Sequence, residues 1–341
     1  MPPETTLPFV SIILPCRNES PYVAGPIETA LNGDYPQDRL EVIAVDGRST
    51  DGTRARLEAL AERDPRVRVL DNPERVTPTA LNRGIAAARG DVILRMDAHS
   101  AYPPSYVRDC VEALQRHNAD NVGGRWIIQP LERDLPARAA EVVLTHPLGV
   151  GGATYRHGAA TPREVDTVPY GCYPRDLFDR IGGFDPHLRR GQDMAFNQRL
   201  RRAGGRIVFD PRIVCYYHPR TRLGGFAARA VENGYWAVYP LRFGVTACGP
   251  RHLAPGAFVL LLIASLWVPP LAAAGVAWLA TVLSLAAHSA WSHRDPGLAF
   301  AVPVYFALLH LGYGVGTLAG LLAVIWRPAA WRALAVAFRW R

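Results

Sequence analysis

The chain has 341 residues, enough for one large domain or for two. Its formal net charge of +8 suits anionic partners such as phosphates, nucleotides or an anionic membrane surface. Nucleic acid is not an expected partner, because the arginines are scattered and neither an arginine-rich arm nor a zinc-finger spacing occurs. The five cysteines are far apart and lack a C-x-x-C pair, which predicts reduced thiols rather than a disulfide framework or a zinc site.

Strands and helices alternate along the first part of the chain. Short apolar runs predict strands, and apolar positions at helical spacing predict helices between them. The strands are expected at 9–14, 40–45, 67–70 and 92–96, and the helices at 22–31, 53–61 and 77–88. This alternation predicts an α/β fold with a doubly wound, mainly parallel sheet. Because neither G-x-G-x-x-G after the first strand nor G-x-x-x-x-G-K-[ST] occurs, a classical dinucleotide fold and a P-loop are disfavoured.

Acidic side chains follow three of these predicted strands. Glu19 lies in the loop after the first strand, Asp46 directly follows the second, and Asp97 follows the fourth, with His99 two residues later. Ligands collect at the carboxyl ends of the strands in open α/β sheets, so we expect these side chains to share one crevice. A carboxylate with an imidazole suits Mn²⁺, or Mg²⁺ held mainly by the carboxylate. The alternative for Asp97 is a capped turn, because Asp is common where a strand gives way to a loop.

The second part of the chain adds a long loop and a second group of polar residues. Residues 146–165 are rich in glycine and lack apolar periodicity, which leaves two interpretations, a mobile cover over the site or a plain linker. Asp193 directly precedes a helix predicted at 194–202, where its ordinary role is that of an N-cap. His218 and Arg220 come after the last predicted strand. A short helix at 174–181 and strands at 207–209 and 213–217 complete the prediction.

Several segments together resemble the nucleotide-diphospho-sugar glycosyltransferases of family 2. They are V-S-I-I-L-P-C-R-N-E-S at 10–20, E-V-I-A-V-D-G-R-S-T-D-G-T at 41–53 and A-L-N-R-G-I-A-A-A-R-G-D-V-I-L-R-M-D-A-H at 80–99. The likeness continues through I-G-G-F-D-P at 181–186 and G-Q-D-M-A-F-N-Q-R-L-R-R at 191–202. H-L-G-Y-G-V-G-T-L-A-G-L-L at 310–322 resembles the membrane-bound branch that includes the succinoglycan-type glucosyltransferases of bacterial exopolysaccharide assembly.

The resemblance implies a GT-A fold and an inverting transfer from a nucleotide-diphospho-sugar, with a UDP-sugar as the expected donor. It implies that Glu19 and Asp46 surround the nucleoside base and ribose, and that Pro15 and Asn82 line the same pocket. On the diphosphate side of the donor, it implies roles for Asp97 and Arg220.

The resemblance also implies a metal site and a general base. Asp97 corresponds to the first acid of the family's D-x-D motif and His99 stands at the second, so these two and His218 are the implied ligands of Mg²⁺ or Mn²⁺. Asp193 matches the acid of an E-D pair that takes the proton of the acceptor hydroxyl. On the acceptor side the implied residues are Gly171 and Gln192, and specificity is expected from the segments 122–126 and 170–173.

The chain departs from the family pattern in three ways. His99 replaces an acid, which makes the expected metal site less negative. Gln192 replaces the Glu that usually precedes Asp193, so contacts with the acceptor are expected to differ. No Q-x-x-R-W follows in the region 220–242, which argues against a processive synthase of the cellulose or hyaluronan type.

Two stretches near the C-terminus are almost free of charge. They are residues 253–288, interrupted by Pro269 and Pro270, and residues 298–326. One membrane crossing needs about 20 residues, so the first stretch is long enough for a tight hairpin. The sequence therefore allows either two or three membrane crossings, and three are favoured. Residues 226–243 either lie at the membrane interface as an amphipathic helix or pack as an ordinary helix.

These patterns divide the chain into a catalytic domain at 1–222, an interfacial segment at 223–252, transmembrane helices at 253–326 and a basic tail at 327–341. Residues 1–8 lack the basic flank and apolar core of a secretory signal, so the catalytic domain is expected on the cytoplasmic side of the inner membrane. By resemblance, the expected acceptor is a saccharide linked to polyprenyl diphosphate. The alternatives are transfer to polyprenyl phosphate itself, and a catalytically silent membrane scaffold with the same fold.

Overall fold

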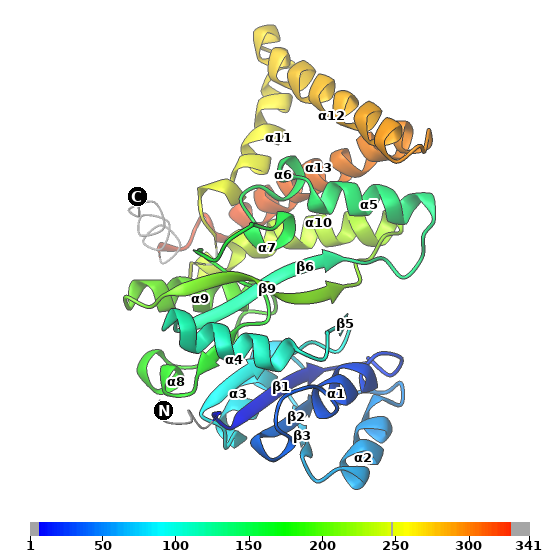
Figure 1. The fold of residues 1–341 in the computed structure, drawn as a ribbon. Helices are drawn as coiled ribbons and strands as arrows, with labels where there is room; N and C mark the ends of the chain where they lie inside the picture. Colours follow the sequence, from blue (N-terminus) through cyan, green and yellow to red (C-terminus); the bar gives the residue numbers. More distant parts are fainter. Residues whose placement is uncertain (1–6, 247, 329–341) are drawn as a thin grey trace. The chain divides into compact units, whose positions relative to one another are not determined.

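Figure 1 shows the computed structural model of the protein, which describes residues 7–246 and 248–328. These residues form two compact units. The first comprises the described residues up to 127 together with 158–217, and the second comprises 128–157 and the described residues from 218 onward. Residues 128–157 fall inside the predicted catalytic domain in the sequence, yet they belong to the second unit. Most of the predicted basic tail, from residue 329 onward, lies outside the described residues.

One half of the sheet in the first unit is parallel, as the sequence predicted. Its strands follow the order β3-β2-β1-β4, and each neighbouring pair is parallel. They are β1 (Val10–Cys16), β2 (Leu40–Asp46), β3 (Val67–Asp71) and β4 (Val92–Arg95). Every residue of β2 is buried, because a parallel sheet covered on both faces favours continuous apolar strands.

The helices between these strands agree with the predicted positions. They are α1 (Ala24–Leu31), α2 (Thr53–Arg63) and α3 (Thr77–Ala87). Helix α3 approaches β1 closely at Gly84, where an added Cβ would lie 2.4 Å from the side chain of Ile13. A larger residue at position 84 would therefore push the helix away from the sheet. This close packing brings the end of β1 and the start of α3 to the same edge of the sheet, where the candidate site lies.

The other half of the sheet is antiparallel, so the sheet as a whole is mixed. From β4 the strand order continues β8-β6-β9-β5, and β7 pairs with β9. These strands are β5 (Ser100–Ala101), β6 (Asn121–Ile128), β7 (Arg163–Glu164), β8 (Cys172–Pro174) and β9 (Ile207–Tyr217). The strands predicted at 207–209 and 213–217 form the single strand β9, which continues through Pro211. Three helices pack with this half: α4 (Tyr106–His117), α8 (Asp176–Ile181) and α9 (Gln192–Arg202).

The second unit is helical. Its helices are α5 (Leu135–Thr145), α6 (Pro147–Val150), α7 (Thr154–His157), α10 (Leu223–Val238), α11 (Ala254–Ala264), α12 (Ala272–Ser292) and α13 (Leu298–Val324). Helix α13 contacts α5, α10, α11 and α12. Glycines allow several of these contacts to be close: an added Cβ would lie 2.0 Å from the Val231 carbonyl oxygen at Gly316, and 2.4 Å from the Pro255 carbonyl oxygen at Gly314. Small residues of this kind let helix backbones approach each other in apolar surroundings.

Two helices of the second unit are long and apolar enough to cross a membrane. They are the 24 residues Pro269–Ser292, which join the 3₁₀ turn η4 (Pro269–Leu271) to α12, and the 27 residues of α13. Helix α11 has 11 residues. At about 1.5 Å per residue it is about 16 Å long, well short of a hydrocarbon core of about 30 Å. The described part of the chain therefore contains two candidate spans, not the three that the sequence favoured.

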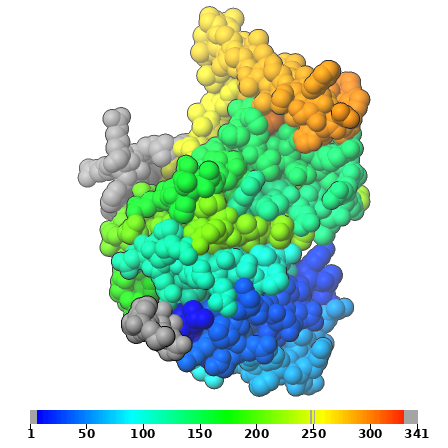
Figure 2. Space-filling view, viewed as in Figure 1, coloured from blue at the N-terminus to red at the C-terminus, as the bar shows by residue number. Residues whose placement is uncertain are grey.

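Large apolar side chains are exposed on α11, α12 and the turn between them. Leu266 and Trp267 in that turn are 76% and 75% exposed, and Trp291 at the end of α12 is 85% exposed. Figure 2 shows α11 and α12, in yellow to orange, projecting from the rest of the second unit. The segment predicted at 226–243 forms α10 and the 3₁₀ turn η2 (Tyr239–Phe243), which both pack against α13.

Candidate functional site

A pocket in the first unit lies at the carboxyl ends of the four parallel strands. The loops after β1, β2, β3 and β4 each contribute to its wall, which is the edge where ligands bind in open α/β sheets. The wall is formed by Pro15, Cys16, Arg17, Glu19, Gly47, Asn72, Arg75, Val76, Thr77, Ala80, Asp97 and His99. Four residues predicted from the sequence are thus brought together, namely Pro15, Glu19, Asp97 and His99.

Four polar residues of the wall were not predicted as site residues, namely Arg17, Asn72, Arg75 and Thr77. Arg17 follows β1, and Asn72 and Arg75 follow β3. The two arginines give the pocket positive charge, which suits a phosphate-bearing ligand. The signal that identified Glu19 and Asp97, a polar residue just after a predicted strand, applies equally to Asn72 and Arg75.

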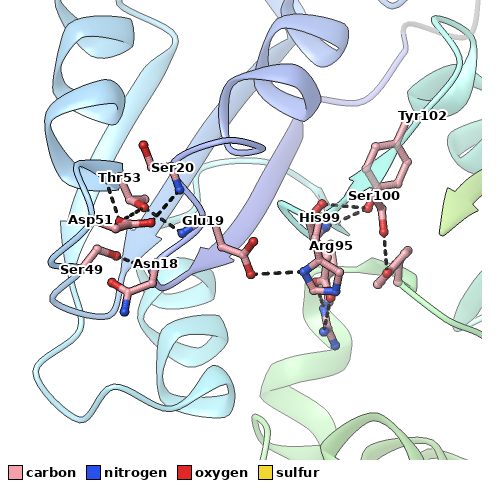
Figure 3. Close-up of polar contacts among 12 residues, drawn as sticks. Asn18, Glu19, Ser20, Ser49, Asp51, Thr53, Arg95, His99, Ser100 and Tyr102 are labelled. Atoms are coloured by element: carbon pink, nitrogen blue, oxygen red, sulfur yellow. Dashed lines mark hydrogen bonds and ion pairs between the residues drawn. The ribbon is translucent and has the colours of Figure 1, made fainter. Parts of the chain in front are cut away.

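Hydrogen bonds between two loops fix the position of Glu19 (Figure 3). The Glu19 backbone NH donates to the Thr53 hydroxyl at 2.8 Å, and the Ser20 NH donates to Asp51 at 3.0 Å. Asn18 accepts from the Thr50 NH at 2.9 Å, which joins the same two loops again. Held in this way, the Glu19 carboxylate points toward His99, whose Nδ1 lies 3.3 Å from Oε1.

Asp46 and Asn82 are not among the described residues of the pocket wall. The Asp46 carboxylate accepts hydrogen bonds from the NH and the hydroxyl of Ser49, which close the turn after β2. The Asn82 amide donates to the Phe184 carbonyl at 2.7 Å and accepts from the Phe184 NH at 2.8 Å. The hydrogen bonds of both side chains therefore stabilise loops near the site.

A buried arginine connects Asp97 with Asp193. Arg95, at the end of β4, donates from Nε to Asp97 Oδ1 at 2.8 Å and from Nη2 to Asp97 Oδ2 at 3.1 Å. Its Nη1 pairs with Oδ1 of Asp193. Only 6% of the Arg95 side chain is exposed, against 30% of Asp193. The two carboxylates, which are remote in the sequence, thus meet at one guanidinium, which the sequence did not single out.

Asp193 lies in the first turn of α9, but it is not the N-cap. The N-cap is Gly191, with φ 74°, and no side chain caps the helix there. Burial raises the pKa of the Asp193 carboxyl above its usual value; Arg95 opposes this rise, and Asp97 adds to it. A carboxylate with a raised pKa, paired with a cation and still partly exposed, fits a general base better than a structural cap.

Of the other two residues implied on the acceptor side, Gly171 lies next to Arg95 in space, and Gln192 directly precedes Asp193 in the sequence. The Gly171 carbonyl accepts from the Arg95 NH at 3.1 Å, and Gln192 is the first residue of α9. Gly171 has no room for a side chain, because an added Cβ would lie 2.3 Å from both Asn121 and Tyr173. Its contribution is therefore a backbone position that supports β4.

Aromatic side chains from both predicted specificity segments form one cluster, of which Tyr170 lies beside Arg95. The guanidinium carbon lies 5.7 Å from the centre of the Tyr170 ring, and the Tyr170 hydroxyl lies 2.7 Å from the Ser100 hydroxyl. Trp126 packs on Tyr170 and stacks on Tyr217, with ring centres 5.1 Å and 4.4 Å away. These rings form a rigid side for the site.

His218 and Arg220 belong to the second unit, directly after β9. The carbonyl oxygen of Gln129 lies 2.6 Å from His218 Nδ1 and can only accept a hydrogen bond, so Nδ1 carries the hydrogen. In a neutral ring, Nε2 then carries the lone pair and is the atom that could bind a metal. Arg220 is exposed.

The donor set fits a cation that is shared with a ligand, not one held by the protein alone. In the part of the chain that the structure describes, no three His, Cys, Asp or Glu side chains are grouped to hold a metal. Asp97 and His99 both line the pocket, but the Asp97 oxygens already accept from Arg95. Mg²⁺ is commonly held by one or two carboxylates together with substrate phosphates, and this wall could serve a cation in that way.

A comparison with known protein families agrees with this fold. Residues 11–181, half of the chain, match the model of the family described as "Glycosyl transferase family 2". The chain is a member of this family and a glycosyltransferase.

Two known proteins are similar to the chain over most of its length. The chain is 31% identical to "Succinoglycan biosynthesis protein ExoA" of Rhizobium meliloti (strain 1021), over 89% of this chain and 92% of that one. It is 30% identical to "Dolichyl N-acetyl-alpha-D-glucosaminyl phosphate 3-beta-D-2,3-diacetamido-2,3-dideoxy-beta-D-glucuronosyltransferase" of Methanococcus voltae, over 66% of this chain and 72% of that one. The resemblance to the succinoglycan-type branch is confirmed.

A solved structure shares the fold. "Mannosyltransferase PcManGT from Pyrobaculum calidifontis in complex with GDP-Man and Mn2+" matches with a TM-score of 0.57 and 23% identity, over 92% of this chain and 88% of that one. At this identity the likeness concerns the fold alone. With the family match it confirms the GT-A fold expected from the sequence.

Proposed function

We propose that this glycosyltransferase moves a sugar, with inversion, from a UDP-sugar to a lipid-linked saccharide in exopolysaccharide or cell-surface glycan synthesis. The observation that carries the proposal is the meeting of Asp97 and Asp193 at Arg95, with Asp97 on the wall of a pocket at the strand ends. A donor site and an acid able to accept a proton are thereby adjacent, which a single displacement at the anomeric carbon requires.

On the donor side, the nucleotide occupies the pocket. Glu19 and Pro15 contact the nucleoside, with Asp46 and Asn82 shaping the loops around it. Arg17 and Arg75 bind phosphate oxygens through charge-assisted hydrogen bonds, and Arg220 adds to them when the donor is bound. Asp97 and His99, with His218, are the protein groups that would hold a divalent Mg²⁺ or Mn²⁺. Such a cation, when bound, neutralises charge on the departing diphosphate.

On the acceptor side, Asp193 takes the proton. The acceptor hydroxyl oxygen bonds to the anomeric carbon while the bond from that carbon to the diphosphate oxygen breaks. The hydroxyl proton passes to Asp193, and the nucleoside diphosphate leaves with the electron pair. A positioned general base contributes about 10²- to 10⁴-fold to such a reaction. Gln192 lies on this side and contacts the acceptor, and the backbone at Gly171 supports the strand end that carries Arg95.

The second unit supports a lipid-borne acceptor. Its two candidate spans and the exposed apolar side chains around α11 and α12 suit attachment to a membrane. The proposed membrane is the inner one, with the catalytic unit facing the cytoplasm, as the sequence led us to expect. The name of the Methanococcus voltae relative describes transfer to a dolichyl-linked sugar phosphate. By analogy, a polyprenyl-diphosphate saccharide is the proposed acceptor.

The test uses membranes from cells that express the full chain, incubated with labelled UDP-sugars, lipid extract and Mn²⁺. The wild type is expected to transfer label to a lipid-linked saccharide, and Asp193→Asn to lower the rate about 10²- to 10⁴-fold. Asp176→Asn is the matched control, because that carboxylate is 68% exposed on α8. Chelation of divalent cations is expected to reduce transfer.

Three outcomes contradict the proposal. Transfer that persists in Asp193→Asn removes the general base from the mechanism. Label that appears on polyprenyl monophosphate identifies the alternative reaction, transfer to the lipid phosphate itself. A wild type that neither transfers nor hydrolyses any donor of a UDP- and GDP-sugar panel identifies a silent scaffold with the same fold.

A further inference from the structure

We infer that Arg95 is a positioning residue for the transfer reaction, holding Asp97 and Asp193 together so that donor and acceptor meet in one geometry. This inference rests on the proposed function, because it assigns Asp97 to the donor side and Asp193 to the acceptor. Arg95 itself need not touch either substrate. It acts through the two carboxylates that it binds.

The backbone of Arg95 is fixed by the sheet. Arg95 lies opposite Ile13 of β1 in the parallel register, and its NH donates to the Gly171 carbonyl at 3.1 Å. The strand ends here, so the side chain starts from a rigid support on both sides. Sites built on strands hold side chains more precisely than sites on loops.

The guanidinium is fixed as well. Nε and Nη2 bind both oxygens of Asp97, and Nη1 binds Asp193. The Tyr170 ring lies 5.7 Å from the guanidinium carbon, within the range of a cation–π contact. With 6% of the side chain exposed, water has little access to replace these partners. A planar, permanently charged fork of this kind suits the simultaneous orientation of two carboxylates.

Asp97 and Asp193 need this cation to stay together. Two carboxylates in a poorly solvated place repel each other, and a cation between them turns the repulsion into two attractions. Without Arg95, Asp193 is free to turn toward solvent, since 30% of its side chain is already exposed. Small displacements of a catalytic group are costly in rate, because the reacting atoms must meet within a narrow range of distance.

A lysine cannot replace the arginine fully. Its single ammonium could supply the charge, but it lacks the two-edged fork that binds Asp97 through two nitrogens and Asp193 through a third. The inference therefore predicts a graded series of kcat values, in which the wild type is highest, Arg95→Lys is intermediate and Arg95→Met is lowest. A role in charge alone predicts instead that lysine restores full activity.

The experiment measures kcat and donor KM for the wild type, Arg95→Lys and Arg95→Met in the same membranes. We expect Arg95→Met to lower kcat about 10²-fold and Arg95→Lys about 10-fold, with the donor KM within about threefold of wild type in both. Arg180→Met is the matched control, because Arg180 is 49% exposed on α8. UDP binding, followed by thermal shift in detergent, is expected to be the same in all four proteins and reports that the fold is intact.

The double variant Arg95→Met/Asp193→Asn tests whether the arginine acts through the base. We expect a loss smaller than the product of the two single losses, since residues that act as a unit have non-additive effects and only the orientation of Asp97 remains to be lost. Independent, multiplying losses would overturn the inference, as would a loss that falls wholly on the donor KM or an unchanged kcat in Arg95→Met. If Arg95→Met does not bind UDP, the Arg95→Lys variant decides by the same split between kcat and KM.

Failure of the proposed function has a different signature. It appears as an inactive wild type or an active Asp193→Asn, whereas failure of this inference appears only among the Arg95 variants of an active enzyme.

Discussion

Arg75 lies on the pocket wall in a backbone conformation that residues other than glycine rarely adopt, with φ 60°. Its loop follows β3 and is held by Asn72, whose amide donates to the Val76 carbonyl at 3.0 Å and accepts from the Thr79 hydroxyl at 2.8 Å. Left-handed conformations of this kind cluster at ligand sites. The turn therefore directs an exposed cation to the pocket.

Arg75→Ala is expected to weaken donor binding without slowing the chemical step. Loss of one charge-assisted hydrogen bond to a phosphate costs about 1.5 kcal/mol, or about tenfold in the donor KM, while kcat stays within about twofold. Arg83→Ala is the control, because Arg83 pairs with Glu74 on the outer side of the same region. Steady-state kinetics with varied donor measure both. A fall in kcat with an unchanged KM would place Arg75 in the chemical step instead.

The rule that polar residues follow strands recovers part of the site from the sequence. Glu19, Asp97 and His99 satisfy it, and all three reach the pocket. Arg95 escapes it, because an arginine inside the apolar run V-I-L-R-M gives no sign that its side chain turns inward to two acids. Asp193 was identified by resemblance alone, since its position before a helix also fits an ordinary cap.

At the scale of elements, a buried carboxylate joins the strands at the edge opposite the pocket. Glu41 of β2 is fully buried and accepts from the Ser11 hydroxyl of β1 at 2.7 Å and from the Arg68 guanidinium of β3 at 3.1 Å. Arg89, just before β4, adds its backbone NH at 2.8 Å and its side chain at 3.0 Å. One acid thereby holds all four parallel strands in register.

Replacing this acid is expected to destabilise the protein in a way that depends on pH. Burial alone would raise the pKa of Glu41, but hydrogen bonds from Arg89, Ser11 and Arg68 hold it below its ordinary value. An acid with a lowered pKa adds stability that is present above its ordinary pKa and is lost as the pH falls through the pKa of the folded state.

Glu41→Gln should therefore lower the midpoint of thermal unfolding at pH 7, by an amount that corresponds to about 1–3 kcal/mol. The difference from wild type is expected to shrink as the pH falls from the ordinary pKa of glutamate, near pH 4.3, through the lower pKa of the folded state, below which both proteins carry a neutral side chain. Thermal unfolding of the full chain in detergent, at pH 7 and at a pH below the folded-state pKa of Glu41, measures the effect. A difference that is equal at both pH values would show that the charge of Glu41 is not what holds the strands.

The sequence predicted all four strands of the parallel half of the sheet, but of the antiparallel half it predicted only the two pieces of β9. Largely apolar runs mark β1, β2 and β4, because nearly every residue of these strands is buried. Strand β6 begins N-V-G-G and β9 contains Pro211, and both features weaken a strand signal. Gly124 is required there, because an added Cβ would lie 1.8 Å from the Ile213 carbonyl oxygen of β9. Packing between distant segments, which one sequence does not display, explains that glycine.

At the scale of the whole molecule, a helical unit accompanies the catalytic unit in one chain. Both ends of α13 contact other segments of the helical unit. Asp295, just before α13, pairs with Arg138 of α5 at 3.2 Å. At the other end, Val324 packs with Val238 and Leu241. The sequence predicted the apolar stretches correctly, but not that α11 is too short to cross. Its length was hidden, because residues 253–288 read as one apolar run around two prolines.

The turn between α11 and α12 therefore differs from a loop between two full crossings. Helix α11 is about 16 Å long, so a hairpin that enters the membrane from one face carries its turn into the hydrocarbon layer and not to the opposite surface. Helix α12, although long enough to cross, then begins inside that layer. Leu266, Trp267 and Val268 in this turn are all exposed apolar residues, as a lipid-embedded turn requires.

A cysteine at position 267 is accordingly expected to be shielded from water on both sides of the membrane. The five native cysteines are buried, which keeps background labelling low. Trp267→Cys should resist a water-soluble maleimide added to intact or to opened membrane vesicles, and should react once detergent is added. Leu131→Cys is the matched control, because Leu131 is 64% exposed on a segment outside the apolar helices. Equal labelling of the two variants in opened vesicles would mean that the turn lies in water, with α11 outside the bilayer or α12 crossing it completely.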